Sequence, residues 1–112
     1  MLRRFCLTLD LQDEPALIKE YEAWHRDVWP EVLESLRDSG IKEMTIYRLQ
    51  NRLCMIMEVA EHFSFEAKAA ADLLNARVQE WEEMMWHFQR PLPWAKPGEK
   101  WLPMEPIFIF HA

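Results

Sequence analysis

The sequence predicts one α+β domain built as a ferredoxin-like βαββαβ subunit, and three observations support this prediction. Alternating apolar residues at the start of the chain and apolar runs in its middle and at its end predict strands, whereas two longer stretches between them have helical spacing. The resulting order of strand, helices, strand, strand, helices and strand is typical of this fold. The 112 residues, half of them hydrophobic, are enough for a single domain over residues 1–112 with a real core.

The first strand is expected over residues 2–10, where side chains of the two faces alternate. One face is formed by Phe5, Leu7 and Leu9. Asp13 is a suitable cap for the helical region that follows, and Pro15 suits the first turn of that helix. Gly40 provides the left-handed residue that ends the helical region near residue 39.

A proline interrupts this helical region. Pro30 has no N–H to bond to the Arg26 carbonyl, and its ring disfavours helical angles at Trp29. We therefore expect two helices, one ending near His25 and one beginning with Pro30. The apolar spacing continues across the break and includes the histidine, which places its side chain on the interior face. The residues of that face are Ile18, Tyr21, His25, Val28, Val32 and Leu36.

Two strands are expected over residues 44–50 and 53–59, and both of their faces are apolar. A sheet with one face in water would alternate more cleanly, so both faces of this sheet should be covered. Helices cover one face of the predicted fold, and a second subunit is the simplest cover for the other. The pattern therefore predicts a symmetric homodimer in which sheet faces sheet.

A second pair of helices is expected after the strands. Ser64 can cap the first of them, and Asn75 separates the two. The later helix carries an apolar stripe at helical spacing. Its members are Val78, Trp81, Met85 and Phe88, and such a stripe is more typical of a core than of a cofactor site.

The region after these helices is rich in proline and tryptophan. Five of the seven prolines lie within residues 91–106, together with Trp94 and Trp101. Proline excludes a helix and disfavours a central strand, whereas tryptophan is unusual in a free linker. We expect an ordered arm that lies on its own subunit or on the partner. Residues 107–110 are strongly apolar and are expected to form a short final strand.

Composition and spacing exclude several classes of function. The net charge of −6 differs from the positive charge that is typical of proteins that bind nucleic acid. No apolar run is long enough to span a membrane and the N-terminus has no signal-peptide core, so a cytoplasmic protein is expected. The four histidines lack metal-ligand spacing and the two glycines form no phosphate loop, so neither a metal nor another cofactor is expected. Cys6 and Cys54 are expected as buried free thiols, with a strand–strand disulfide as the alternative.

His25 is the best candidate for chemistry. Histidine titrates near neutral pH and can both accept and donate a proton. Tyr21, one turn earlier on the same face, can add a hydroxyl contact, and the surrounding aromatic side chains suit the C–H faces of a sugar. The alternative is a core histidine bonded to a nearby carbonyl group, and position alone leaves both interpretations open.

The run Y-x-x-x-H-x-x-x-W-P-E over residues 21–31, followed by Gly40 and Ile46-Tyr47, resembles the L-rhamnose mutarotase family. The similarity extends to the strand at residues 57–59 and to Trp81, and so covers about residues 1–90. It implies a dimeric α/β barrel of ferredoxin-like subunits. It also implies an aldose 1-epimerase that interconverts the α and β anomers of a 6-deoxy-L-hexose without cofactor or metal.

The same resemblance implies His25 as the acid/base group. The substrate-binding residues that we expect around it are Tyr21, Trp29, Met44, Glu58, Trp81 and Glu82. Two of them depart from the family pattern, because Glu82 replaces the second of two adjacent tryptophans and Met44 replaces a tyrosine. These departures leave the histidine chemistry intact and make L-fucose a candidate beside L-rhamnose. The second proton carrier is open among Tyr21, Glu58, Glu82 and a water molecule.

Two other functions are compatible with these residues. One is a different enzyme on the same scaffold, such as a haem-degrading or cofactor-free monooxygenase, because one fold serves many chemistries. The other is a binding module in which the tryptophan-rich arm holds a sugar or a peptide without turnover.

Overall fold

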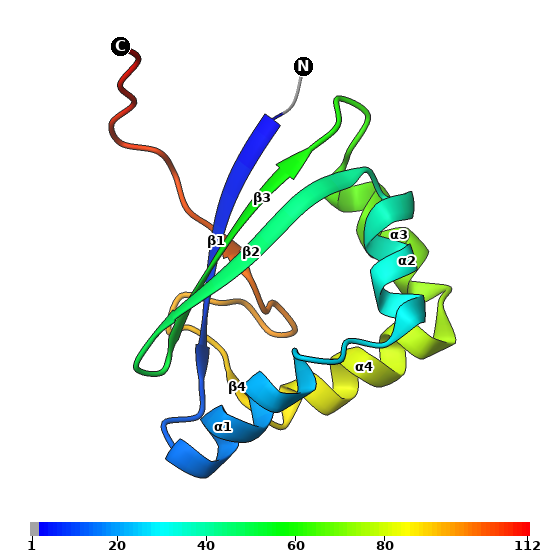
Figure 1. Cartoon of the computed structure of the whole chain (residues 1–112), viewed down its shortest axis with the longest axis vertical. Coiled ribbons are helices and arrows are strands. Elements are labelled where there is room, and N and C mark those ends of the chain that lie inside the picture. The colour runs from blue at the N-terminus through cyan, green and yellow to red at the C-terminus, as the bar shows by residue number, and fades with distance from the viewer. Residues whose placement is uncertain (1–2) are drawn as a thin grey trace.

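One antiparallel sheet carries the helices of the described chain on one of its faces (Figure 1). The computed structural model describes residues 3–112, so the first two residues of the chain, including the start of the first expected strand, lie outside it. The strands are β1 (Arg3–Leu11), β2 (Ile41–Leu49), β3 (Arg52–Val59), β4 (Gln89–Arg90) and β5 (Leu102–Pro103). The helices are α1 (Pro15–Trp24), α2 (Pro30–Asp38), α3 (Phe65–Leu73) and α4 (Ala76–Trp86).

The strand order is β2-β3-β1-β4, with β5 also paired to β1, and every pairing is antiparallel. This order and the alternation of strands with helix pairs confirm the predicted α+β ferredoxin-like fold. The strand β2 begins three residues earlier than expected, at Ile41. It can do so because Gly40, at φ +96°, turns the chain from α2 directly into the sheet. A side chain at this position would also collide with the ring of His62, whose Nε2 would lie 2.7 Å from an added Cβ.

The helix boundaries follow local signals in the sequence. Ser64 and Asn75 cap α3 and α4, since their side chains accept hydrogen bonds from the backbone N–H groups three residues later. The expected cap at Asp13 is wrong, because Glu14 occupies the cap position of α1 and makes no side-chain bond there. None of the helices within residues 3–112 is long and apolar enough to cross a membrane.

Two clusters of buried side chains fill the space between the helices and the sheet. The first cluster comprises Leu11, Tyr21, Val32, Leu53, Trp81, Met85 and Phe88. The second cluster comprises Leu7, Ile41, Met55, Met57, Val59 and Phe63. Ile46 and Trp101 pack against both clusters, so they join the two halves of the core.

The fourth strand of the sheet is divided into two pieces. Asp10 pairs with Arg90 in β4, whereas Thr8 pairs with Leu102 in β5. A continuous strand would place residue 92 opposite Thr8, so ten additional residues are looped out between the pieces. They form the Pro/Trp-rich arm, which contains turns but no helix and lies partly on its own subunit, because Leu92 is buried and Trp101 packs on the core.

The expected final strand over residues 107–110 does not form. The ladder with β1 ends where the N–H of Met104 donates to the carbonyl oxygen of Cys6. Continued in the register of β5, residue 107 would stand opposite Arg3, the first residue of β1, so the segment runs past the described end of its neighbour. The four side chains are between 66% and 98% exposed.

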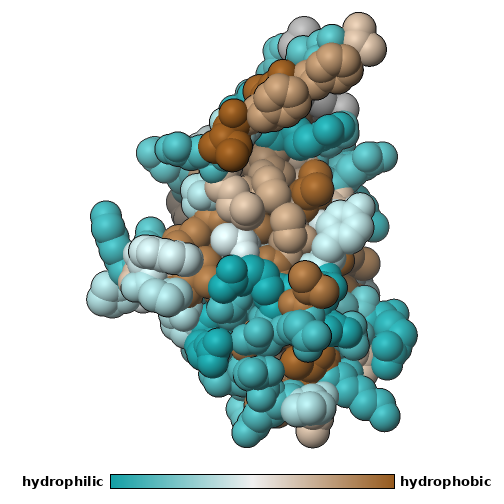
Figure 2. All heavy atoms as spheres, turned by 90° about the vertical axis from the view of Figure 1, so that its left-hand side faces the viewer, coloured by the Kyte–Doolittle hydropathy of each residue, from teal (hydrophilic) through white to brown (hydrophobic). Residues whose placement is uncertain are grey.

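The sheet face opposite the helices carries exposed apolar side chains among polar ones in the single chain. Tyr47 is 58% exposed and Leu49 is 76% exposed, whereas Cys54 and Ile56 beside them on β3 are half-buried. Figure 2 shows this side of the molecule, where hydrophobic side chains lie among hydrophilic ones and the C-terminal segment stands out above them. The expected apolar side chains of the second face are therefore exposed in the single chain.

Candidate active site

The candidate site begins at the break between the first two helices. His25 is the cap residue at the end of α1, and Pro30 is the first residue of α2. Trp29 adopts φ −57° and ψ 137°, outside the helical region, as expected for a residue before proline. The predicted break at the proline is therefore confirmed, and it leaves the histidine at an exposed helix end beside irregular backbone.

The imidazole of His25 is held by the backbone one turn earlier. Its Nδ1 lies 2.9 Å from the carbonyl oxygen of Tyr21. Because a carbonyl oxygen can only accept, Nδ1 must carry the proton in the neutral ring. The Nε2 atom therefore keeps its lone pair and is the nitrogen that can accept a proton from a ligand.

Aromatic rings surround this histidine. Its ring centroid lies 4.4 Å from that of Tyr21 and 5.6 Å from that of Trp81. Trp24 and Trp29 in turn pack edge-on against Trp81, at 6.5 and 5.3 Å. His25 is half-buried, and burial lowers its pKa below the ordinary 6.5, although the bond to the Tyr21 carbonyl and the charge of Glu82 act in the opposite direction. The ring is therefore neutral at neutral pH.

Tyr21 places a hydroxyl group in the core beside this ring. The side chain is 4% exposed, and its hydroxyl oxygen accepts a hydrogen bond from Nε2 of Gln89 at 3.4 Å. Burial raises the pKa of Tyr21 to about 12, opposed by the bond from Gln89. The hydroxyl therefore keeps its proton at neutral pH and can donate it in a hydrogen bond.

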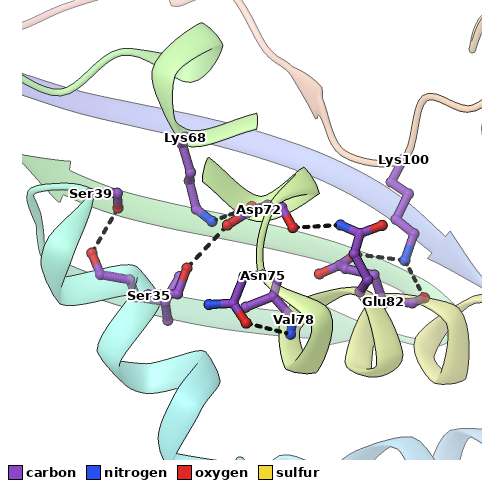
Figure 3. Close-up of polar contacts among 10 residues, drawn as sticks. Ser35, Ser39, Lys68, Asp72, Asn75, Val78, Glu82 and Lys100 are labelled. Carbon is purple, nitrogen blue, oxygen red and sulfur yellow. Dashed lines mark hydrogen bonds and ion pairs between the residues drawn. The ribbon is translucent and has the colours of Figure 1, made fainter. Parts of the chain in front are cut away.

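A charged pair links the arm to the same region (Figure 3). Nζ of Lys100 lies 2.7 Å from Oε2 of Glu82 and 2.8 Å from the backbone oxygen of that residue, and it also lies over the ring of Trp86. Burial lowers the pKa of Lys100, while Glu82 raises it. The negative charge of Glu82 acts on both His25 and Tyr21, since it raises the pKa of each.

The structure brings together five of the seven expected site residues. His25, Tyr21, Trp29 and Trp81 are in a chain of ring contacts, and Glu82 follows directly on α4. Met44 lies on the helix-facing side of the sheet but packs on the second cluster. Glu58 is on the opposite face of the sheet and pairs with Arg4 at 2.7 Å, so it does not join this group.

Two residues at the site were not expected from the sequence, namely Gln89 and Lys100. Gln89 lies in a two-residue strand that has no detectable pattern, and Lys100 lies in the arm. Their only sequence signal is that a polar residue follows the apolar stripe of α4 and that a lysine stands beside Trp101.

Two hollows of the surface lie beside the site rather than in it. One, of about 410 Å³, lies between α2 and α3, and its polar groups pair with one another, as Ser35 and Lys68 do with Asp72 (Figure 3). The other, of about 420 Å³, is lined by Trp24 and Trp29 on the outer side of the rings that enclose Trp81. Within residues 3–112, no group of three His, Cys, Asp or Glu side chains is arranged to hold a metal ion.

Comparison with known proteins identifies the family. Residues 4–110 match the family described as L-rhamnose mutarotase. The chain belongs to the L-rhamnose mutarotase family. It is therefore a mutarotase, an isomerase that interconverts the anomers of a sugar, and the resemblance carried by residues 21–31 is confirmed.

Two relatives are mutarotases of different sugars. An L-fucose mutarotase of Xanthomonas campestris pv. campestris is 50% identical over 109 residues, which cover 96% of this chain and 87% of that protein. An L-rhamnose mutarotase of Paraburkholderia phytofirmans is 25% identical over 100 residues, which cover 88% of each chain.

Solved structures agree on the fold of this family member. An L-rhamnose mutarotase from Formosa agariphila superposes with a TM-score of 0.70 at 22% identity, covering 97% of this chain and 99% of that one. The tetracenomycin F2 cyclase of Streptomyces glaucescens superposes with a TM-score of 0.64 at 16% identity, covering 98% of both chains. One backbone arrangement thus occurs in a sugar isomerase and in a polyketide cyclase.

Proposed function

We propose that this chain is an L-fucose mutarotase in which His25 is the acid/base group. The observation that carries the proposal is the 50% identity to an L-fucose mutarotase over nearly the whole chain, against 25% to an L-rhamnose mutarotase. The presence of Glu82 beside the rings around His25 supports a sugar other than L-rhamnose, since L-fucose differs from it in the hydroxyl groups at C2 and C4.

The reaction needs a base at the anomeric hydroxyl and an acid at the ring oxygen. In our proposal Nε2 of His25 takes the proton from the anomeric hydroxyl, and the ring C–O bond breaks as a proton reaches the ring oxygen. The C1 carbonyl of the open-chain aldehyde then rotates, so that its other face meets the hydroxyl that closes the ring. Closure by the reverse proton transfers yields the other anomer. A positioned acid/base group contributes roughly 10²–10⁴-fold, or about 3–5 kcal/mol, which is appreciable for a reaction that also proceeds spontaneously.

The surroundings of His25 suit this role. Burial keeps the imidazole neutral, and the bond from Nδ1 to the Tyr21 carbonyl leaves Nε2 as the proton acceptor. Trp81 and Trp29 offer apolar faces against which the C–H groups of a sugar pack. The protonated hydroxyl of Tyr21 is our choice for the second proton carrier, because Glu58 lies on the other face of the sheet.

The proposal is tested by saturation-transfer NMR of anomer exchange on L-fucose and L-rhamnose. We expect the wild type to accelerate L-fucose more than L-rhamnose, and His25→Asn to lose roughly 10²–10⁴-fold of the acceleration. His87→Asn, at the corresponding cap position of α4 but exposed, is the matched control and should keep full activity. A wild type that accelerates neither sugar would refute the proposed function.

We further propose that the protein acts as a homodimer in which the outer sheet faces meet. The exposed apolar side chains of Tyr47 and Leu49 and the segment of residues 107–110 support this proposal, because a second copy would remove them from water. A second copy would cover the face that the helices leave open.

A further inference from the structure

Gln89 is a buried polar residue whose side chain is only half satisfied. It is 3% exposed and belongs to β4, where it pairs with Leu11. Its backbone oxygen accepts a hydrogen bond from Nε2 of Gln12 at 3.1 Å. In the side chain, Nε2 donates to the hydroxyl of Tyr21, whereas Oε1 has no partner among the described residues.

The unpaired oxygen does not result from the orientation chosen for the amide group. If the amide were turned over, Oε1 would accept from the Tyr21 hydroxyl, and the two N–H donors would be left unmatched instead. One end of this amide is therefore available in either orientation. Because burying an unpaired polar group destabilises the folded state, its presence in the core points to a partner that the chain itself does not supply.

The neighbours of the amide define the chemistry of that partner. Gln89 contacts Tyr21, whose ring centroid is 4.4 Å from that of His25, so the amide stands one residue away from the proposed acid/base group. Phe88, next to it in sequence, also packs edge-on against the tyrosine ring. A neutral ligand with hydroxyl groups and apolar faces fits these surroundings, whereas a charged ligand would lose its hydration without gaining an opposite charge from the amide.

We infer that Gln89 is a sugar-binding residue, whose amide oxygen accepts a hydrogen bond from a hydroxyl of the bound 6-deoxy-L-hexose and whose amide N–H orients the Tyr21 hydroxyl toward that sugar. The inference rests on the proposed function and assigns to it a residue that the sequence did not reveal. Since the N–H of Gln89 occupies a lone pair of the tyrosine oxygen, the tyrosine proton points away from the amide. Loss of the amide should therefore impair both the hydroxyl contact and the orientation of the tyrosine.

Replacement of Gln89 with methionine separates this role from a structural one. Gln89→Met keeps the length of the side chain and removes its polar atoms, so it should lower kcat/KM on L-fucose by roughly tenfold or more. Tm should change little, because removal of the unpaired oxygen and loss of the bond to Tyr21 offset each other. A structural amide would instead show a lower Tm and unchanged activity. The matched control is Gln79→Met on α4, whose Nε2 has a partner in the Asp72 carbonyl at 2.9 Å. It should leave activity unchanged.

A double-mutant cycle with Tyr21→Phe tests the orientation step. Once the tyrosine hydroxyl is absent, Gln89→Met should cost less than it does in the wild type, because part of its effect acts through that hydroxyl. If the loss of activity in the double variant equals the product of the losses in the two single variants, the orientation step is overturned. If the wild type is active and Gln89→Met is equally active, the inference about Gln89 is overturned and the proposed function stands. If the wild type is inactive, the proposed function and the inference are overturned together.

Discussion

The ammonium group of Lys100 lies 2.7 Å from the carboxylate of Glu82, although one residue belongs to the arm and the other to α4. The lysine side chain is 12% exposed and the glutamate side chain is 43% exposed, so this pair is only partly shielded from water. It ties the arm to the helix that carries Trp81. It also places a compensating positive charge beside a carboxylate that acts on His25.

Lys100→Met should move the pH dependence of the enzyme. Without the lysine, the negative charge of Glu82 is uncompensated and stabilises the protonated imidazole, which raises the pKa of His25 above its wild-type value. Because the neutral imidazole is the proposed base, the acidic limb of kcat/KM should shift to higher pH. The profile between about pH 5 and 8 measures this shift. Glu82→Gln should shift the acidic limb to lower pH. If the limb moves in the same direction in both variants, the charges of Lys100 and Glu82 do not act on the pKa of His25 in the way described.

The wild-type profile carries a prediction of its own. Burial lowers the pKa of His25 in the folded protein below 6.5, so more than half of the imidazole is neutral at that pH. The acidic limb of kcat/KM should therefore have its midpoint below pH 6.5 and should be absent in His25→Asn. A midpoint above 6.5 would mean that another group is titrating or that the carboxylate effect exceeds that of burial.

Pro30→Ala should reduce activity without unfolding the protein. Alanine restores an N–H that can bond to the Arg26 carbonyl, so α1 and α2 can extend toward each other and displace His25. Since a displacement of about 1 Å can cost 10²-fold in rate, we expect a loss of roughly 10- to 100-fold, with an unchanged circular dichroism spectrum. Pro15→Ala, at the first position of α1, is the matched control. Equal activity of the two variants would show that the break does not position the histidine.

Trp101→Ala should destabilise the fold, because its ring packs on both core clusters. Truncation of a fully buried tryptophan to alanine lowers the free energy of unfolding by about 3–5 kcal/mol. Because this ring is half-buried, we expect urea unfolding to show a decrease of about 2–3 kcal/mol. Trp94→Ala is the control from the same arm. Its side chain is 74% exposed, and the substitution should change stability by less than about 0.5 kcal/mol.

Sedimentation velocity tests the proposed homodimer. The wild type should sediment as a dimer at micromolar concentration, and Phe108→Asp combined with Phe110→Asp should shift it toward the monomer if residues 107–110 lie in the interface. Leu74→Asp is the control, since this leucine is 90% exposed at the end of α3, away from the outer sheet face. A wild type that is monomeric at these concentrations would refute the homodimer.

Features that depend on neighbouring residues were predictable from the sequence. The break at Pro30, the turn at Gly40 and the caps at Ser64 and Asn75 arise from the chemistry of the residue itself. His25 could be placed on the interior face because helical periodicity continues across the break. These local signals are enough to specify the order of the elements and hence the fold.

Features that depend on pairing across the fold were not predictable. Residues 107–110 have strong strand propensity, yet a strand needs a partner, and in the register of β5 residue 107 already stands opposite Arg3, where the described part of β1 begins. Glu58 was expected at the site, but side-chain alternation in β3 places it on the opposite face. Gln89 and Lys100 meet Tyr21 and Glu82 only in the folded chain, so no spacing in the sequence identifies them.

The division of the fourth strand leaves the hydrogen-bond register of β1 independent of the length of the arm. Asp10 and Thr8 keep their partners on either side of the arm, so residues can be added to it or removed from it without shifting the sheet. Loops at such positions tolerate length change at small entropic cost. Transplanting the arm between relatives should therefore leave the register of the sheet and the position of His25 unchanged.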